Sequence, residues 1–159
     1  MKSNDEGQDA PSDRGETLIT WSDRYDTGIG IIDSQHRELV NLINKLYRAC
    51  AHGGDGIDAG FREAMSAMVE YVHFHFDAEA EILERSNYPQ VSEHRKEHEK
   101  LVKAILEALQ EYESGAPLVP EKFAQTLKDW VFSHIAVHDR AFGKYLAEQK
   151  KPGFSQKRE

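Results

Sequence analysis

HFDAE at residues 75–79, SNYP at 86–89 and HRKEH at 94–98 are the parts of this sequence that decide the fold. The first and last of these segments each contain two metal-type ligands four residues apart. On an α-helix this spacing places both side chains on one face, one turn apart. Two helices joined by the short Pro-containing break could therefore direct His75, Glu79, His94 and His98 at one shared point.

Four amphipathic segments surround this stretch. The second and third helices are expected at about 58–85 and 91–113; the first begins near Asp33 or Ser34 and the fourth near Pro120, a favourable first helical residue. Apolar residues recur at intervals of three and four, and no strand pattern competes. The sequence predicts an all-α fold, an up-down-up-down antiparallel four-helix bundle. The inward stripes are Ile32, His36, Leu39, Ile43, Leu46 and Cys50; Phe61, Met65, Met68, Val72, His75, Glu79 and Ile82; His94, His98, Leu101, Ile105, Ala108 and Tyr112; and Phe123, Leu127, Trp130, His134, Val137 and Ala141.

The chain divides into one domain and two tails. Residues 1–16 are expected to be a mobile polar tail, residues 17–149 the bundle domain, and residues 150–159 a polar C-terminal tail. Residues 17–32 contain two glycines among aromatic and aliphatic side chains, which predicts an ordered N-terminal arm laid across the bundle rather than a helix.

Composition excludes several classes of protein. The formal net charge is -8 with no basic stripe, which argues against a nucleic-acid partner. Cys50 is the single cysteine, so a disulfide framework is excluded and a packing role is expected for it. There is no apolar segment long enough to insert in a membrane. We expect a cytoplasmic protein that is a monomer, because no second apolar face is visible.

The histidines separate by the face on which they fall. His36, His75, His94, His98 and His134 lie on inward stripes together with Glu79. His73 and Asp77 are also four residues apart, but they share a face with polar residues, so this pair is rejected as a ligand pair. His52 lies in a Gly-rich loop and is expected to be exposed.

A single inward histidine is more often a hydrogen-bonded core residue than a metal ligand. Five inward histidines and a glutamate in one small bundle would be costly as unpaired polar groups, and a buried metal centre satisfies all of them at once. The fourth helix offers His138 or Asp139 as a further ligand. Spacing favours His138, because Asp139 lies about 140° around an ideal helix from His134.

The ordered pattern H…HxxxE…HxxxH…HxxxxD resembles the hemerythrin family, specifically the single-domain bacterial hemerythrins, over about residues 18–147. Short segments that flank these residues also resemble the family, including Gly28-Ile29, the run from Ile32 to His36, Tyr88-Pro89 and Asp129-Trp130. The resemblance implies that His94, His98 and His134 hold one iron, that His36 and His75 hold the other, and that Glu79 and Asp139 bridge the two. It therefore selects Asp139 over His138, which is left with a structural role near the site.

The family implies a non-haem di-iron centre with a bridging oxide or hydroxide, which binds O2 reversibly. Two six-coordinate irons offer about twelve positions. Five histidines, two bridging carboxylates and the bridging oxygen leave one position, on the iron with two histidines, where O2 is expected to bind as peroxide. The candidate walls of the O2 pocket are Leu39, Phe76, Leu101 and Trp130. No catalytic residue is expected.

Three other functions fit parts of the pattern. A di-iron oxidase, peroxidase or nitric oxide reductase would use more carboxylates, and neither Glu79 nor Asp139 is followed by a histidine three residues later. An iron- or oxygen-sensing interaction module is a second alternative. A structural zinc protein is a third, although zinc needs only four ligands. For the O2-binding function, storage, delivery to an oxygen-consuming enzyme and sensing all stay open.

Overall fold

The computed structural model describes residues 17–51, 57–116 and 119–151. The helices are α1 (Gly30–Ala51), α2 (Ile57–Arg85), α3 (Val91–Glu113), α4 (Pro120–His134) and α5 (Arg140–Gln149), with a short η1 turn (Asp23–Tyr25) and a π-helical segment η2 (Ile135–Asp139). The predictions for the tail at 1–16, for His52 and for most of the tail at 150–159 concern residues outside these ranges.

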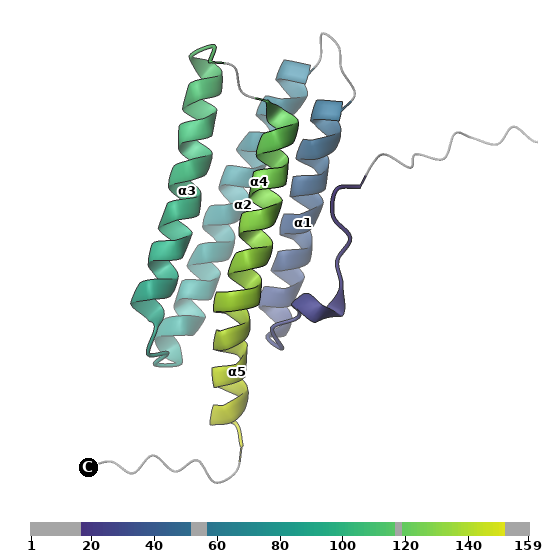
Figure 1. The fold of residues 1–159 in the computed structure, drawn as a ribbon. Helices are drawn as coiled ribbons and strands as arrows, with labels where there is room; N and C mark the ends of the chain where they lie inside the picture. The colour runs from purple at the N-terminus through teal and green to yellow at the C-terminus, as the bar shows by residue number, and fades with distance from the viewer. Residues whose placement is uncertain (1–16, 52–56, 117–118, 152–159) are drawn as a thin grey trace, which may run out of the picture.

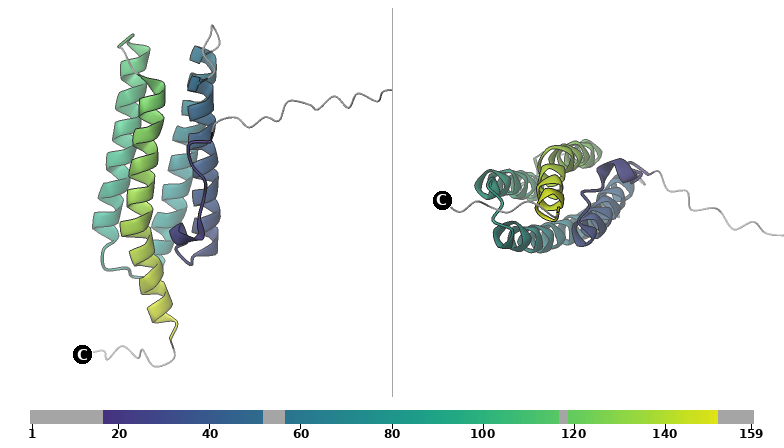
Figure 2. Two further views of the ribbon diagram at one scale, coloured as in Figure 1. Left: turned by 45° about the vertical axis from the view of Figure 1, so that its right-hand side comes forward. Right: turned by 90° about the horizontal axis from the view of Figure 1, so that it is seen from below.

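The four long helices form an antiparallel bundle (Figure 1), as the sequence predicts. α1 packs against α2 and α4, and α2 packs against α3. The buried apolar side chains form one main cluster and a smaller one that contains Leu83, Tyr88 and Phe142. α5 continues beyond the end of α4 (Figure 2). In the described part of the chain every element is helical or irregular, and none of the helices is long and apolar enough to cross a membrane.

The N-terminal arm lies along α1, as expected (Figure 1). The side chain of Asn44 in α1 accepts a hydrogen bond from the backbone N–H of Ile19 and donates one to its carbonyl, both at 2.9 Å. Ile19 is buried in the core. These bonds replace the strand partner that an extended segment would otherwise need.

The start of α1 differs from the prediction. The helix begins at Gly30, and Asp33 lies inside its first turn instead of acting as the N-cap. The Asp33 carboxylate accepts hydrogen bonds from the N–H and hydroxyl of Thr27, both at 2.7 Å, and from the N–H of Gly28. The carboxylate thus satisfies donors that precede the helix, which allows the helix to begin earlier.

Most positions of the inward stripes are buried or half-buried as predicted, but the register of the stripe shifts in two places. In α2, Leu83 is fully buried and Ile82 only half-buried, so the stripe shifts by one residue near the end of the helix. Val137 and Ala141 were expected to face inward and are exposed, while Ile135 and Phe142 are buried. This last change follows from the π-helical segment, which alters the register after His134.

Candidate metal centre

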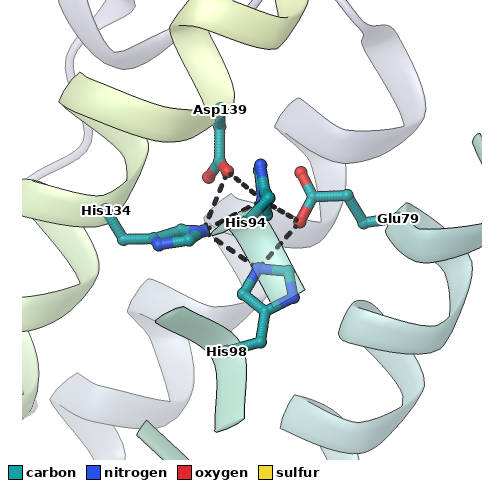
Figure 3. Close-up of side chains that lie close together, drawn as sticks. All are labelled: Glu79, His94, His98, His134 and Asp139. Carbon is teal, nitrogen blue, oxygen red and sulfur yellow. Dashed lines mark hydrogen bonds and ion pairs between the residues drawn. The ribbon is translucent and has the colours of Figure 1, made fainter. Parts of the chain in front are cut away.

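Five ligand-type side chains from four elements of the bundle meet in the core (Figure 3). α2 contributes Glu79, α3 contributes His94 and His98, α4 contributes His134, and the π-helical segment contributes Asp139. All five are buried, and one ligand atom from each lies within 4.8 Å of the others.

Three imidazole nitrogens form the centre of this group. His98 Nε2 lies 2.9 Å from His134 Nε2, which in turn lies 3.2 Å from His94 Nε2. One oxygen of each carboxylate completes the cluster: Glu79 Oε2 is 3.1 Å from His98 Nε2, and Asp139 Oδ1 is 3.0 Å from His134 Nε2. Three neutral imidazoles and two carboxylates directed at one point form the set of donors that a transition-metal ion accepts.

The remaining two predicted ligands are His36, which contacts Asp139, and His75, which lies beside His36. His36 Nε2 is 3.1 Å from Asp139 Oδ2, the oxygen that is not in the three-histidine cluster. The rings of His36 and His75 are 4.8 Å apart, edge to face. The structure therefore gathers Glu79, His94, His98, His134 and Asp139 in one cluster. It places His36 against Asp139, and His75 beside His36.

The unsatisfied polar atoms test whether this arrangement fits metal ions. Among the described residues, seven buried side-chain atoms have no hydrogen-bond partner: His36 Nε2, Glu79 Oε1, both oxygens of Asp139, and the Nδ1 atoms of His36, His94 and His134. Orphaned polar atoms of this kind are costly in a folded core. Metal ions held at the site would satisfy His36 Nε2 and the carboxylate oxygens, but not the three Nδ1 atoms.

The segment after His134 explains why Asp139 enters the site. Residues 135–139 form a π-helix, and the N–H of Arg140 bonds to the carbonyl of Ile135, five residues earlier. Hydrogen bonding from i to i+5 places Asp139, rather than His138, above His134. His138 is half-buried, and its ring stacks on that of His134 at 5.0 Å. The preference for His138 from spacing alone was wrong because it assumed an ideal α-helix.

Burial and charge oppose each other in the electrostatics of the site. Burial and the charge of Asp139 raise the pKa of Glu79, but hydrogen bonds with His94 and His98 outweigh them and lower it to about 2. The pKa of Asp139 is also held well below its usual range, since contacts with His134, His36 and His94 overcome its burial. Burial lowers the pKa of His94, yet the two carboxylates raise it overall to about 9. Burial lowers the pKa of His75 to about 4. The two buried anions thus require a nearby cation, either a proton on His94 or metal ions.

Aromatic rings cover two of the imidazoles. Phe76 lies parallel to His98, with ring centroids 3.6 Å apart and an angle of 3°. Trp130 stacks on His134 at 4.7 Å and 9°. Leu39 and Leu101 are both 2% exposed and belong to the main core. His73 is exposed, which agrees with its rejection as a ligand.

Sequence analysis missed Gln35. Its side-chain oxygen lies 2.9 Å from Nδ1 of His75, and Gln35 is buried. Because this contact holds the proton on Nδ1, Nε2 keeps its lone pair for a metal. The sequence carried only a weak signal, since a polar residue beside a predicted ligand is equally typical of a solvated position.

Comparison with known proteins agrees with this geometry. The model of the hemerythrin HHE cation binding domain matches residues 27–146. The chain belongs to the hemerythrin family. It is 27% identical to a bacteriohemerythrin of Methylococcus capsulatus over 131 residues, covering 82% of this chain and 98% of that protein. It is 30% identical to a bacteriohemerythrin of Stenotrophomonas maltophilia over 125 residues, covering 79% of each.

A solved wild-type hemerythrin has the same fold. It aligns with a TM-score of 0.75 at 27% identity, over 82% of this chain and 98% of that one. Residues 27–146, which match the family model, include all seven predicted ligands and the π-helical segment of this hemerythrin-family chain.

Proposed function

We propose that this protein binds O2 reversibly at two iron ions. One observation carries the proposal: three histidines and two buried carboxylates meet at one point, and a second pair of histidines begins at the other oxygen of Asp139. In this assignment His94, His98 and His134 would hold one ion, His36 and His75 would hold the other, and Glu79 and Asp139 would be shared by both. When bound in the ferrous state, the ions would supply the two electrons and the open coordination position that O2 needs.

The unequal number of histidines in the two groups determines where O2 should bind. The two-histidine side has one protein ligand fewer than the three-histidine side, so an exogenous ligand fits there. Gln35 supports this side by keeping the ring of His75 in one orientation through the contact at 2.9 Å. O2 should therefore bind beside His36 and His75.

The aromatic walls keep water away from the three-histidine side. Phe76 covers the face of His98 and is 8% exposed, while Trp130 covers His134 and is only partly buried. A dry site slows autoxidation, because water and anions compete for the metal. We expect Trp130→Ala to accelerate loss of the oxygenated spectrum. An oxidation rate equal to that of the parent protein would show that Trp130 is not part of the barrier.

We further propose that the protein is a carrier and not an enzyme. Five neutral imidazoles beside two carboxylates leave the pair of ions less anionic than in carboxylate-rich di-iron enzymes. This should disfavour the higher oxidation states that such enzymes use. Steady consumption of O2 in the presence of a reductant, at a rate above that of autoxidation, would contradict the proposal.

The deciding experiment is optical. Iron-loaded protein is reduced without oxygen, its visible spectrum is recorded, air is admitted, and the sample is then purged with argon. We expect a new band that appears with air and disappears on purging. A spectrum that never changes, or that changes once and does not return, would refute reversible binding.

A further inference from the structure

A groove of about 660 Å³ between α2 and α3 reaches the metal centre only at His98. Its floor contains Phe76 and His98, the pair whose rings lie parallel at 3.6 Å. Ala80, Val102 and Leu106 form its apolar middle. Leu106 is 47% exposed, which makes it one of the large apolar side chains that the bundle leaves in water.

The charges at the rim favour a particular ligand. Arg95 and Lys103 line the groove but already pair with Glu84 and Glu107. Asp77 and Glu99 also line it, and neither forms an ion pair within the described ranges. The chain as a whole carries a net charge of -8. A neutral ligand therefore suits the groove better than a phosphorylated one.

The size and shape favour a small molecule over a protein. The volume lies within the range of about 300–1,000 Å³ that is usual for small-ligand sites. An apolar middle between two charged helix faces accepts a flat aromatic body whose polar edges reach the rim. Phe76 is 8% exposed, so it would lie beneath such a body as part of the lining.

We propose that this groove binds a neutral, planar aromatic electron carrier of the flavin class, and that Phe76 and His98 connect it to the metal centre. The second half of the proposal rests on the proposed function, because it takes His98 as an iron ligand. A carrier must return to the ferrous state after autoxidation. Reduced flavin would become oxidised flavin, releasing two protons to solvent and two electrons, one for each ferric ion.

The stacked rings give these electrons a short route. An electron that leaves a flavin on the groove floor crosses Phe76 and reaches His98 through atoms in van der Waals contact. His98 is 5% exposed, so solvent alone has little access to it. Leu106 lies in the groove but is not among the proposed ligands, so it can be changed without changing the ligand set.

Equilibrium dialysis of riboflavin against the iron-loaded protein tests the binding half. We expect saturable binding of one riboflavin, weaker binding of flavin mononucleotide, and about tenfold weaker riboflavin binding in Leu106→Glu. Phe74→Glu is the matched control, because Phe74 is also on the bundle surface at 57% exposure but does not line the groove. Absence of saturable binding, or equal weakening in both variants, would overturn the proposal.

Stopped-flow reduction of the air-oxidised protein tests the electron route. Leu106→Glu should slow reduction by reduced riboflavin about tenfold, in line with its weaker binding, and leave reduction by dithionite unchanged. Equal slowing with both reductants, or no slowing with riboflavin, overturns the route. Loss of riboflavin binding with a normal O2 spectrum rejects this inference alone, whereas a missing O2 spectrum with normal riboflavin binding rejects the proposed function.

Discussion

The contact between Gln35 and His75 leads to a prediction that separates the two halves of the metal centre. Gln35 accepts the Nδ1 proton of His75 at 2.9 Å, with both side chains buried. The mutation Gln35→Leu keeps the volume of the side chain and removes the acceptor. The His75 N–H is then buried without a partner, and its ring is free to turn away from the site.

The size of the effect follows from this single bond. A buried donor that loses its partner costs about 1–3 kcal/mol. Loss of a hydrogen bond that orients a ligating histidine lowers metal affinity about 10–100-fold. Gln35 has no contact with His94, His98 or His134 among the interactions of the described residues, so the three-histidine side should keep its affinity.

Anaerobic titration with ferrous iron against a competing chelator measures both affinities. In Gln35→Leu we expect one tight ion and one weakened by about 10–100-fold. Gln35→Glu retains an acceptor and should bind both ions. Asn41→Leu, which removes an exposed amide from the same helix, is the control for a general effect on α1. Equal weakening of both ions, or no weakening, would show that Gln35 does not orient His75.

Three further outcomes are expected. Deletion of the exposed Ala136 should leave iron stoichiometry unchanged. In the deletion variant Asp139 follows His134 by four residues, and an α-helix places both side chains on one face. Loss of iron would refute this account of the π-helix. The pKa of His94 is raised to about 9 without metal, so metal binding at pH 7 should release about one proton. Calorimetry in buffers of different ionisation enthalpy measures the number of protons released. A heat of binding that does not depend on the buffer would contradict this proton release. A Cβ at Gly143 would lie 2.0 Å from a backbone carbonyl oxygen of the N-terminal arm. Gly143→Ala should therefore lower the free energy of unfolding, measured in urea, by about 1–3 kcal/mol or more. An unchanged midpoint of urea unfolding would contradict this prediction.

The raised pKa of His94 also makes the stability of the metal-free protein depend on pH, in the opposite direction to its metal affinity. His94 titrates at about 9 when folded, against an ordinary value of 6.5. Its contribution to stability is therefore complete below about 6.5 and is lost as the pH rises through 9. Metal affinity changes the other way, because the metal must displace this proton.

The helices and six of the seven candidate ligands were predictable because burial in a bundle repeats at short intervals. His75 and Glu79 lie in register with Val72 and Met68, so the period of the helix alone assigned them to the core. The same argument correctly placed His73 on the surface. Local periodicity is a property of the chain, and it reports which face of a helix is apolar without knowledge of the partner helices.

Asp139 and Gln35 required other information. The resemblance selected Asp139 against the spacing, and the structure supplies the reason in the π-helical segment, which no local period reveals. The role of Gln35 depends on the packing of α1 against α2, which brings it within 2.9 Å of a residue 40 positions away. Amino-acid order determined which faces are buried and which side chains carry metal-binding chemistry. The tertiary structure decided which of those side chains meet, because a contact between helices depends on register and rotation that neither helix encodes by itself.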